Sequence, residues 1–326
     1  MAAPTGTFSR YSAIGIREDL ADVIYNISPE ETPFVSNIGR ETADNTLFEW
    51  QVDELAAASA ASAAVEGGDA PQNSSSPTTR LANYTQINTK DVTISGTLEI
   101  VKKAGRKSEL AYQLAKRGKE VKRDIEYSAL QNQVAVAGDT NTTPRRTAGL
   151  PAFLRTNTNR GSGTVTPGAD PTVSGGLVNA AATDADTTRP FDEADFKEVV
   201  QKVWTEGGTP KMLMVGPFNK VAASAFVGIA DIRYNLSSAK EAAIIGAADV
   251  YVSDFGKISI VANRFQRERD AFVLDPEYAA IAWLRPMTQF PLAKTGDSEK
   301  RQILGEWGLM VHQQKAHGVV ADLDVS

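Results

Sequence analysis

The chain contains no cysteine and only two histidines among its 326 residues. Without cysteine there is no disulfide framework and no thiol chemistry, as is typical of proteins made in a reducing cytosol. No segment approaches the ~20 consecutive apolar residues of a membrane span, and the start MAAPTGTFSRYSAIGIRED lacks the basic region and apolar run of a signal peptide. We therefore expect neither secretion nor a membrane partner.

An excess of positive charge is also missing. The formal net charge is -6, so the chain lacks the surplus of Lys and Arg on which general nucleic-acid binding depends. Hydrophobic residues make up 42% of the chain, which is sufficient for a core, and the length is typical of about two domains. We expect a folded protein whose nucleic-acid contacts are confined to a local surface.

Catalytic constellations are scarce. His312 and His317 are five residues apart on a predicted strand and so on opposite faces, which suits no metal pair and predicts surface residues. The sequence has no G-x-S-x-G elbow, and AGRKSEL departs from a phosphate-binding loop because Arg106 stands where glycine should precede the lysine. Asp322 and Asp324 could bind a cation, but no other potential ligand follows at a suitable spacing. We therefore predict that they are solvated residues near the chain end. We expect no enzyme, no metal and no cofactor.

A long segment without core-forming residues lies between two strand-like runs. Residues 46–52 alternate with period two, and the Thr-rich run 84–95 places Val92 and Ile94 on one face, so the runs are predicted to pair as a long hairpin. Between them lie mainly Ala, Ser, Gly and Pro. About 25 residues without structure inside a compact domain indicate either a functional loop or a disordered linker.

Residues 98–138 predict a long amphipathic helix, because apolar residues recur at spacings of four or seven. Gly118 lies on this apolar stripe, where it predicts close packing or a bend. The other faces carry an excess of basic residues, leaving a net charge of about +4, which indicates either a solvated face or an anion-binding surface. The stripe consists of Leu110, Leu114, Val121, Ile125 and Ala129, and the basic residues are Lys102, Lys103, Arg106, Lys107, Lys116, Arg117, Lys119, Lys122 and Arg123.

The rest of the chain has a clear order. Residues 1–45 form an arm, amphipathic at 16–25 and then broken by Pro29 and Pro33, that has too little apolar surface to fold alone. A Gly-, Ser- and Thr-rich passage at 155–189 crosses to a mixed α/β half, and the tail predicts a long strand that closes the first sheet. The elements expected in that half are helices at 191–204 and 217–226 and strands at 211–215, 250–253, 258–262, 271–274 and 280–284.

This order of parts resembles the major capsid proteins of tailed bacteriophages, which have the Hong Kong 97-like fold. The stretches ISPEETPFVSNIGRETADNTLFEWQVDEL, PRRTAGLPAFL, VGPFNK and GEWGLMVHQQKAHGVV resemble a podovirus-type branch, as an ordered set that spans nearly the whole chain. The resemblance implies a mixed α+β fold in five parts: an N-terminal arm at 1–45, an E-loop hairpin at 46–95, a peripheral domain with spine helix and crossing at 96–190, an axial α/β domain at 191–295, and a return strand at 296–326 that closes the peripheral domain.

The resemblance also implies a function. Such proteins self-assemble in the bacterial cytoplasm into the icosahedral shell that encloses the double-stranded DNA of the virion. Expected partners are further copies in hexamers and pentamers, a scaffolding protein, a portal, a decoration or cement protein where the virion has one, and packaged DNA bound without sequence preference. The nine basic residues above would lie near DNA on the inner face. The E-loop residues expected between subunits are Leu47, Trp50, Val65, Arg80 and Tyr84.

Two departures limit what the resemblance implies. Some relatives crosslink their shells through an E-loop lysine, but residues 53–89 contain no Lys, so we expect no such crosslink. Other relatives carry an N-terminal scaffolding segment of their own, whereas this chain reaches its hairpin by Thr46, so we expect a separate scaffolding protein. The alternatives are a minor virion component, such as a cement or tail protein, and an enzyme with an unfamiliar site.

Overall fold

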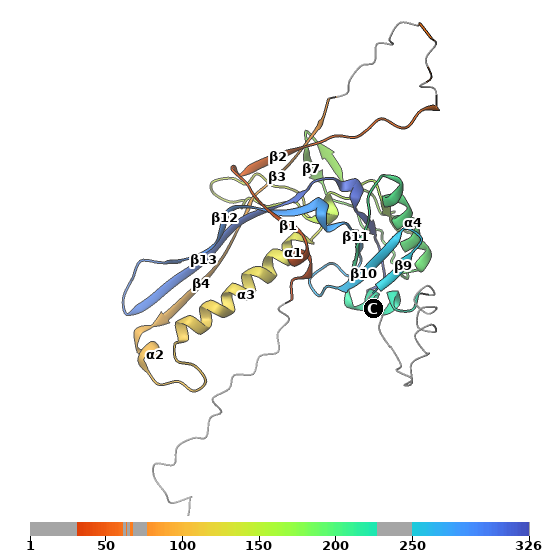
Figure 1. Ribbon diagram of the computed structural model, residues 1–326. Coiled ribbons are helices and arrows are strands. Elements are labelled where there is room, and N and C mark those ends of the chain that lie inside the picture. Colours follow the sequence, from red (N-terminus) through yellow and green to blue (C-terminus); the bar gives the residue numbers. More distant parts are fainter. Residues whose placement is uncertain (1–30, 61–62, 64–65, 68–76, 227–249, 326) are drawn as a thin grey trace, which may run out of the picture.

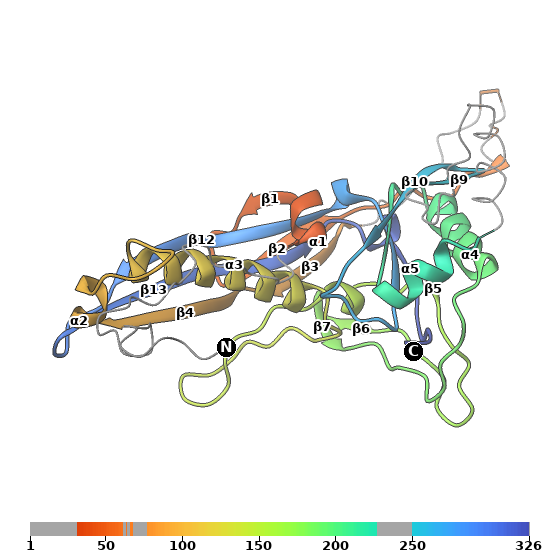
Figure 2. The same cartoon turned by 90° about the horizontal axis from the view of Figure 1, so that it is seen from below.

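The computed structural model describes residues 31–60, 63, 66–67, 77–226 and 250–325. They form an elongated body with long strands and the long helix at one end and a second sheet with shorter helices at the other (Figures 1 and 2). The helices are α1 (Pro33–Asn37), α2 (Gly96–Ile100), α3 (Glu109–Ala129), α4 (Glu193–Thr205) and α5 (Pro217–Ala223). The strands are β1 (Gly39–Thr42), β2 (Leu47–Val52), β3 (Thr79–Tyr84), β4 (Gln86–Ser95), β5 (Thr158–Asn159), β6 (Thr172–Ser174), β7 (Leu177–Ala180), β8 (Met212–Val215), β9 (Val250–Ser253), β10 (Gly256–Ala262), β11 (Ala271–Leu274), β12 (Ala279–Pro291), β13 (Ser298–Val311) and β14 (Gly318–Val320).

A four-stranded sheet in the order β1-β12-β13-β4 forms one end of the body. Strand β13 pairs antiparallel with both β12 and β4, while β1 runs parallel to β12. Helix α3 lies along this sheet (Figure 2) and turns Val121, Ile125 and Ala129 into the core, as their spacing predicts. The predicted long strand in the tail is confirmed as β13, which closes the first sheet.

A six-stranded sheet in the order β5-β14-β11-β8-β10-β9 forms the other end. All four residues of β8 are buried, and they alternate between two hydrophobic clusters: Met214 belongs to the core shared with the first sheet, and Leu213 to the cluster under α4. A strand that is buried on both faces has a continuous run of apolar residues. The run in KMLMV therefore predicts the buried strand β8. Helix α4 is confirmed, and Phe196 and Val199 are among its fully buried residues.

The long helix predicted over 98–138 is wrong in its extent, because the chain forms two helices separated by a link at 101–108. Gly105 in this link has a φ of +74°, a conformation that breaks a helix and suits glycine. Ser108 and Glu99 then accept hydrogen bonds from the first N–H groups of α3. The close packing predicted at Gly118 is also wrong, since no atom lies within 4 Å of a Cβ built there.

The predicted pairing of the hairpin is corrected as well. The outgoing strand β2 pairs with β3, from Leu47↔Tyr84 to Val52↔Thr79, so Tyr84 is the only residue of the predicted run 84–95 that pairs with β2. That run is β4, which leaves the hairpin at Thr85 and joins β13 in the four-stranded sheet. Its Thr-rich alternation suits any half-buried strand, so the pattern alone could not name the partner.

Two of the predicted domain boundaries do not follow the sheets. Strand β12 falls in the range 191–295 expected for the axial domain, yet it pairs with β13 in the four-stranded sheet. The range 296–326 was expected to close the peripheral sheet, yet its last strand, β14, pairs with β11 in the six-stranded sheet. The chain therefore returns to the four-stranded sheet earlier than predicted, at β12, and crosses once more than predicted, at β14.

Candidate assembly and DNA-facing surfaces

The base of the β2–β3 hairpin is anchored inside its own subunit. Trp50 is only 8% exposed, stacks on Phe48 with ring centroids 5.9 Å apart, and donates from Nε1 to the carbonyl of Val311 at 3.0 Å. Trp50, predicted among the intersubunit residues, therefore packs in the core of its own subunit and not on the exposed surface of the hairpin. Gly308 lies beneath the hairpin, and a Cβ there would come within 2.4 Å of the Phe48 ring.

Asn83 fixes the return strand of the hairpin and was missed in the sequence. Its side chain is fully buried and donates to Thr147 Oγ1 at 2.9 Å and to the carbonyl of Leu309 at 2.7 Å. Its Oδ1 accepts from the N–H of Ala148 at 2.9 Å. One amide therefore joins the hairpin to two segments far away in sequence. One polar residue creates no periodic pattern, so nothing in the sequence indicated the buried role of Asn83.

Beyond this base the chain leaves the body (Figure 1). All of residues 53–60 are exposed, and Leu55 is 99% exposed although it is a large apolar side chain. The direction of departure is set by Lys315, whose Nζ lies 2.8 Å from carboxylate oxygens of both Glu54 and Glu206. Among the other predicted E-loop residues, Arg80 is exposed and pairs across the hairpin with Glu49.

The remaining E-loop residues differ in their setting. Leu47 and Tyr84 are half-buried and pair with each other across the hairpin. Val65 lies outside the described residues. The structure thus places the four described residues, Leu47, Trp50, Arg80 and Tyr84, at the base of the hairpin, from its buried inner side to its exposed edge, and does not bring them together as one surface.

The nine predicted basic residues fall into two groups. The first lies on the link before α3, where Lys103 donates to three backbone carbonyls at the end of α2 and Arg106 pairs with Glu109. Lys102 and Lys107 are exposed on the same link. These four residues were predicted to lie on a helix face, and that placement is wrong because the link is not helical.

The second group lies on α3. The Arg117 guanidinium forms an ion pair with the Glu120 carboxylate one turn further along the helix, at an N–O distance of 2.6 Å. Lys116, Lys119 and Lys122 are exposed and Arg123 is half-buried. Residues 116, 119 and 123 are three and four positions apart, so they share the helix face that is turned away from the core. This outward basic stripe, defined as Lys116, Lys119 and Arg123, is the local concentration of positive charge that the sequence predicts.

Residues 31–45 of the predicted arm are docked on their own subunit. Phe34 is fully buried, and the N–H groups of Phe34 and Val35 each donate to the Glu126 carboxylate at 2.8 Å. Helix α1 has no capping side chain of its own, so a carboxylate from α3 caps it. Asn263 also donates to Glu126, at 2.6 Å. Burial raises the pKa of Glu126, while the three donors oppose that shift.

Two polar residues near the C-terminus are buried and a third is half-buried, contrary to prediction. His317 is 1% exposed, with its Nδ1 3.3 Å from the N–H of Asp275, and burial lowers its pKa to about 4. Asp322 is also 1% exposed and accepts from the N–H groups of Gly161 and Ala185 at 3.0 and 2.7 Å. Asp324 is half-buried. Asp322 thus holds the crossing segment to the end of the chain, so surface solvation describes neither Asp322 nor His317.

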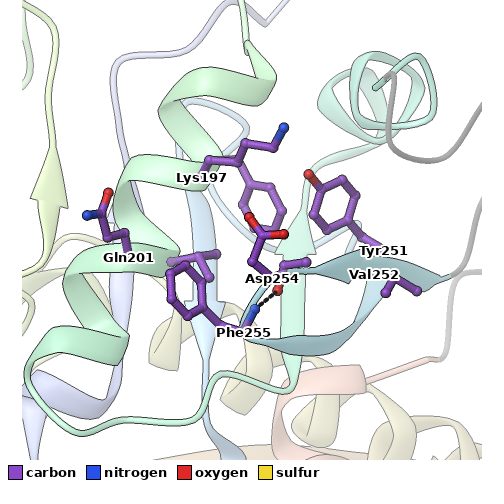
Figure 3. A pocket seen from close by; sticks show the side chains of 9 residues that line it. Lys197, Gln201, Tyr251, Val252, Asp254 and Phe255 are labelled. Carbon is purple, nitrogen blue, oxygen red and sulfur yellow. Dashed lines mark hydrogen bonds between the residues drawn. The ribbon is translucent and has the colours of Figure 1, made fainter.

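A pocket between α4 and the β9–β10 turn has polar groups at its rim (Figure 3). Its volume is about 510 Å³, and its floor includes Phe196 and Tyr251. The polar groups bind one another, because Glu193 accepts from Tyr251 Oη at 2.7 Å and pairs with Lys197 at 2.9 Å. Burial raises the pKa of Tyr251 well above its usual range. A phenol held in this state is a poor general base at neutral pH.

The comparisons with known proteins agree with this architecture. A cyanophage A-1(L) capsid structure aligns with a TM-score of 0.62 at 10% identity, covering 97% of this chain and 99% of that chain. A structure of phage G major capsid proteins and decoration proteins aligns with a TM-score of 0.53 at 11% identity, covering 99% and 100%. The major capsid protein of Escherichia phage Phieco32 is 30% identical over 351 residues, covering 98% of this chain and 97% of that protein.

The chain therefore has the fold of these phage capsid structures, the Hong Kong 97-like fold. The sequence model of the SU10 major capsid protein family matches residues 3–324, and the chain belongs to that family. Its role is structural, as a component of the virion capsid. The podovirus-type branch stays a prediction. Across the residues that the structure describes, no helix has the length and apolar character needed to cross a membrane.

Proposed function

We propose that residues 53–78 act between subunits of the shell, as the E-loop of this capsid protein. The observation that supports this most strongly is the contrast between the hairpin base and the loop. The base is held by Trp50 and Asn83 inside its own subunit, whereas Leu55 directly beyond it is 99% exposed. A second subunit that covered such a loop could add several hundred Å² to an interface of about 1,600 Å².

The test separates folding from assembly. Replacing residues 56–78 by an Asn-Gly turn leaves β2 and β3 intact, and loop shortening changes the closure entropy only slowly. The melting temperature of the unassembled subunit should stay nearly unchanged, while shells fail to form or break easily. A large fall in melting temperature, or robust shells, would overturn the proposal.

A point variant gives a sharper version of the same test. Leu55→Ser should lower shell yield without changing subunit stability, because the side chain contacts nothing in its own subunit. Val165→Ser is the matched control, since Val165 is 86% exposed on a different loop. Equal loss of assembly in both variants would show that exposed apolar side chains in general, and not this loop, support the shell.

The outward basic stripe on α3 is proposed to face packaged DNA. Its side chains lie on a helix of a chain with a net charge of -6, and no base-reading element accompanies them, so the contacts would be directed to phosphates. The double variant Lys116→Glu and Arg123→Glu should lower DNA retention and its dependence on salt more than it lowers particle yield. The control carries the same charge change at Lys257 and Arg264, which are exposed elsewhere. Equal effects of both pairs would refute the assignment.

The other predicted parts are proposals of the same kind. Residues 1–30 would contact neighbouring copies, in hexamers and pentamers, and the six-stranded sheet would form the axial domain around their centres. A scaffolding protein, a portal and a decoration protein are proposed as partners; decoration proteins accompany the major capsid proteins in the phage G structure. We propose a structural role without enzymatic turnover, which is supported by the mutual pairing of the polar groups around the α4 pocket.

A further inference from the structure

A second pocket lies between α1, α3 and β12, where the described chain begins. Its volume is about 380 Å³, and its walls are mainly apolar, with Val35, Ile281 and Trp283 among them. Among the residues that the structure describes, Arg40 and Lys122 are the only charged ones that line it, and both are exposed. Neither forms an ion pair within the described part of the chain. An apolar pocket with two unpaired cations fits an occupant that is apolar on one side and acidic on the other.

One segment of this chain has that character. Residues 16–25, IREDLADVIY, place Ile16, Leu20 and Ile24 at helical spacing. The segment contains one basic and three acidic residues, so its net charge is −2 against the +2 of the pocket. The match therefore extends to both the apolar character and the charge.

The attachment of this segment also favours the pocket. Thr32 already lines it, and only residues 26–31 separate Thr32 from Tyr25. Those six residues can span roughly 20 Å when extended, which is enough to turn back. A segment tethered at the mouth of its own site has an effective concentration in the millimolar range, far above that of a segment from another copy in dilute solution.

The neighbouring hollow is a poorer site for the same segment. It lies on the other side of Trp283 and shares Arg40 and Pro286 with the first pocket. Its lining adds the carboxylates of Glu41 and Asp44, which would repel an acidic occupant.

We propose that, in the unassembled subunit, residues 16–25 dock into the α1–α3–β12 pocket of their own chain, with their acidic residues beside Arg40 and Lys122. The docked state holds the arm on its own subunit before assembly. This docking in the unassembled subunit does not depend on the proposed role of the arm in the shell, where the same residues would leave the pocket and contact neighbouring copies.

The absence of cysteine makes a direct test simple, because an engineered pair supplies the only thiols. In the full-length unassembled subunit, Leu20→Cys with Met287→Cys should form an intramolecular disulfide about tenfold faster than Leu20→Cys with Thr288→Cys. Met287 lines the pocket, whereas Thr288 is the next residue of β12 and does not. Adding Arg40→Glu and Lys122→Glu should remove this advantage, while Lys116→Glu on the same helix should not.

Three results would overturn the proposal. Equal rates for the Met287 and Thr288 pairs would show that the segment does not occupy the pocket. Crosslinking only between chains, in a mixture of the two single-cysteine proteins, would assign the pocket to a second copy. If the cysteine variants fold poorly, tryptic cleavage after Arg17 in the cysteine-free chain decides, since it should quicken severalfold with Lys122→Glu and not with Lys116→Glu. Unchanged cleavage in both would refute docking.

Discussion

Glu126 provides the most direct test of how the arm is held on the subunit. Its carboxylate accepts from the N–H groups of Phe34 and Val35 and from the Asn263 amide; Phe34 and Asn263 are buried and Val35 is half-buried. Glu126→Gln keeps the shape but presents an NH₂ group to at least one of these donors. Leaving one or two buried donors unpaired should lower the free energy of unfolding by about 1–3 kcal/mol. Glu126→Ala leaves all three unpaired and should cost about 2–4 kcal/mol, because relief from burying a carboxylate whose pKa is raised offsets part of the loss.

The assay is urea unfolding of the unassembled subunit at pH 7, together with tryptic cleavage after Arg40 in β1. Cleavage should quicken in both Glu126 variants because α1 and β1 detach together when the cap is lost. Glu120→Gln is the control, since Glu120 lies on the same helix but pairs with the partly exposed Arg117, an interaction worth about 0–1 kcal/mol. If Glu126→Gln and Glu120→Gln gave the same unfolding midpoint and the same cleavage rate, the capping role would be refuted.

Two further predictions concern pH and glycine. Burial raises the pKa of Asp270 to about 6 and lowers that of His317 to about 4. Asp270 therefore contributes stability that is lost as pH rises from about 4 to 6, and His317 contributes stability that is lost as pH falls from about 6.5 to 4. Between pH 4.5 and 6.5, the free energy of unfolding of Asp270→Asn should rise with pH more steeply than that of the wild type. For His317→Gln it should rise less steeply. Curves parallel to that of the wild type would contradict both assignments. Gly308→Ala should destabilise the subunit by about 1–3 kcal/mol because its Cβ meets the Phe48 ring, whereas Gly118→Ala, in open space on α3, should stabilise it by about 0.5–1 kcal/mol. Thermal melts of the two alanine variants check the opposite signs.

Periodic apolar patterns predicted much of this fold. The buried stripe of α3, the inward face of α4 and the continuous run of β8 all appear where their spacing places them. The breaks between elements were predicted less well. Gly105 lies in the link between two helices and Ser108 caps the second, yet both fit inside an amphipathic pattern that continues across them. Strand pairing was also open, because the Thr-rich face of β4 suits β13 as well as it suits β2.

Sequence composition predicted which residues form the candidate surfaces, and the burial of those residues in the structure corrected part of the set. The basic set is present, but the link at 101–108 separates four of its members from the helix, so the outward stripe is shorter than expected. Trp50 was assigned to the E-loop because it lies on the hairpin, and only the position of Val311 reveals that it points inward. A strand pattern with period two states that alternate residues share a face, but it does not state which face meets the core.

The residues that no pattern revealed share one physical task. Asn83, Glu126 and Asp322 are buried polar side chains, and each bonds backbone groups of segments that lie more than 60 residues away. Those segments are the docked arm, the passage around Ala148 and the crossing near Gly161, and the bonded N–H groups lie in the first turn of α1 or in irregular chain. Their backbone N–H groups would otherwise be buried without partners. Side-chain acceptors thus replace strand pairing as the means of holding these segments, so the hairpin base remains fixed in the subunit while residues 53–60 directly beyond it are exposed.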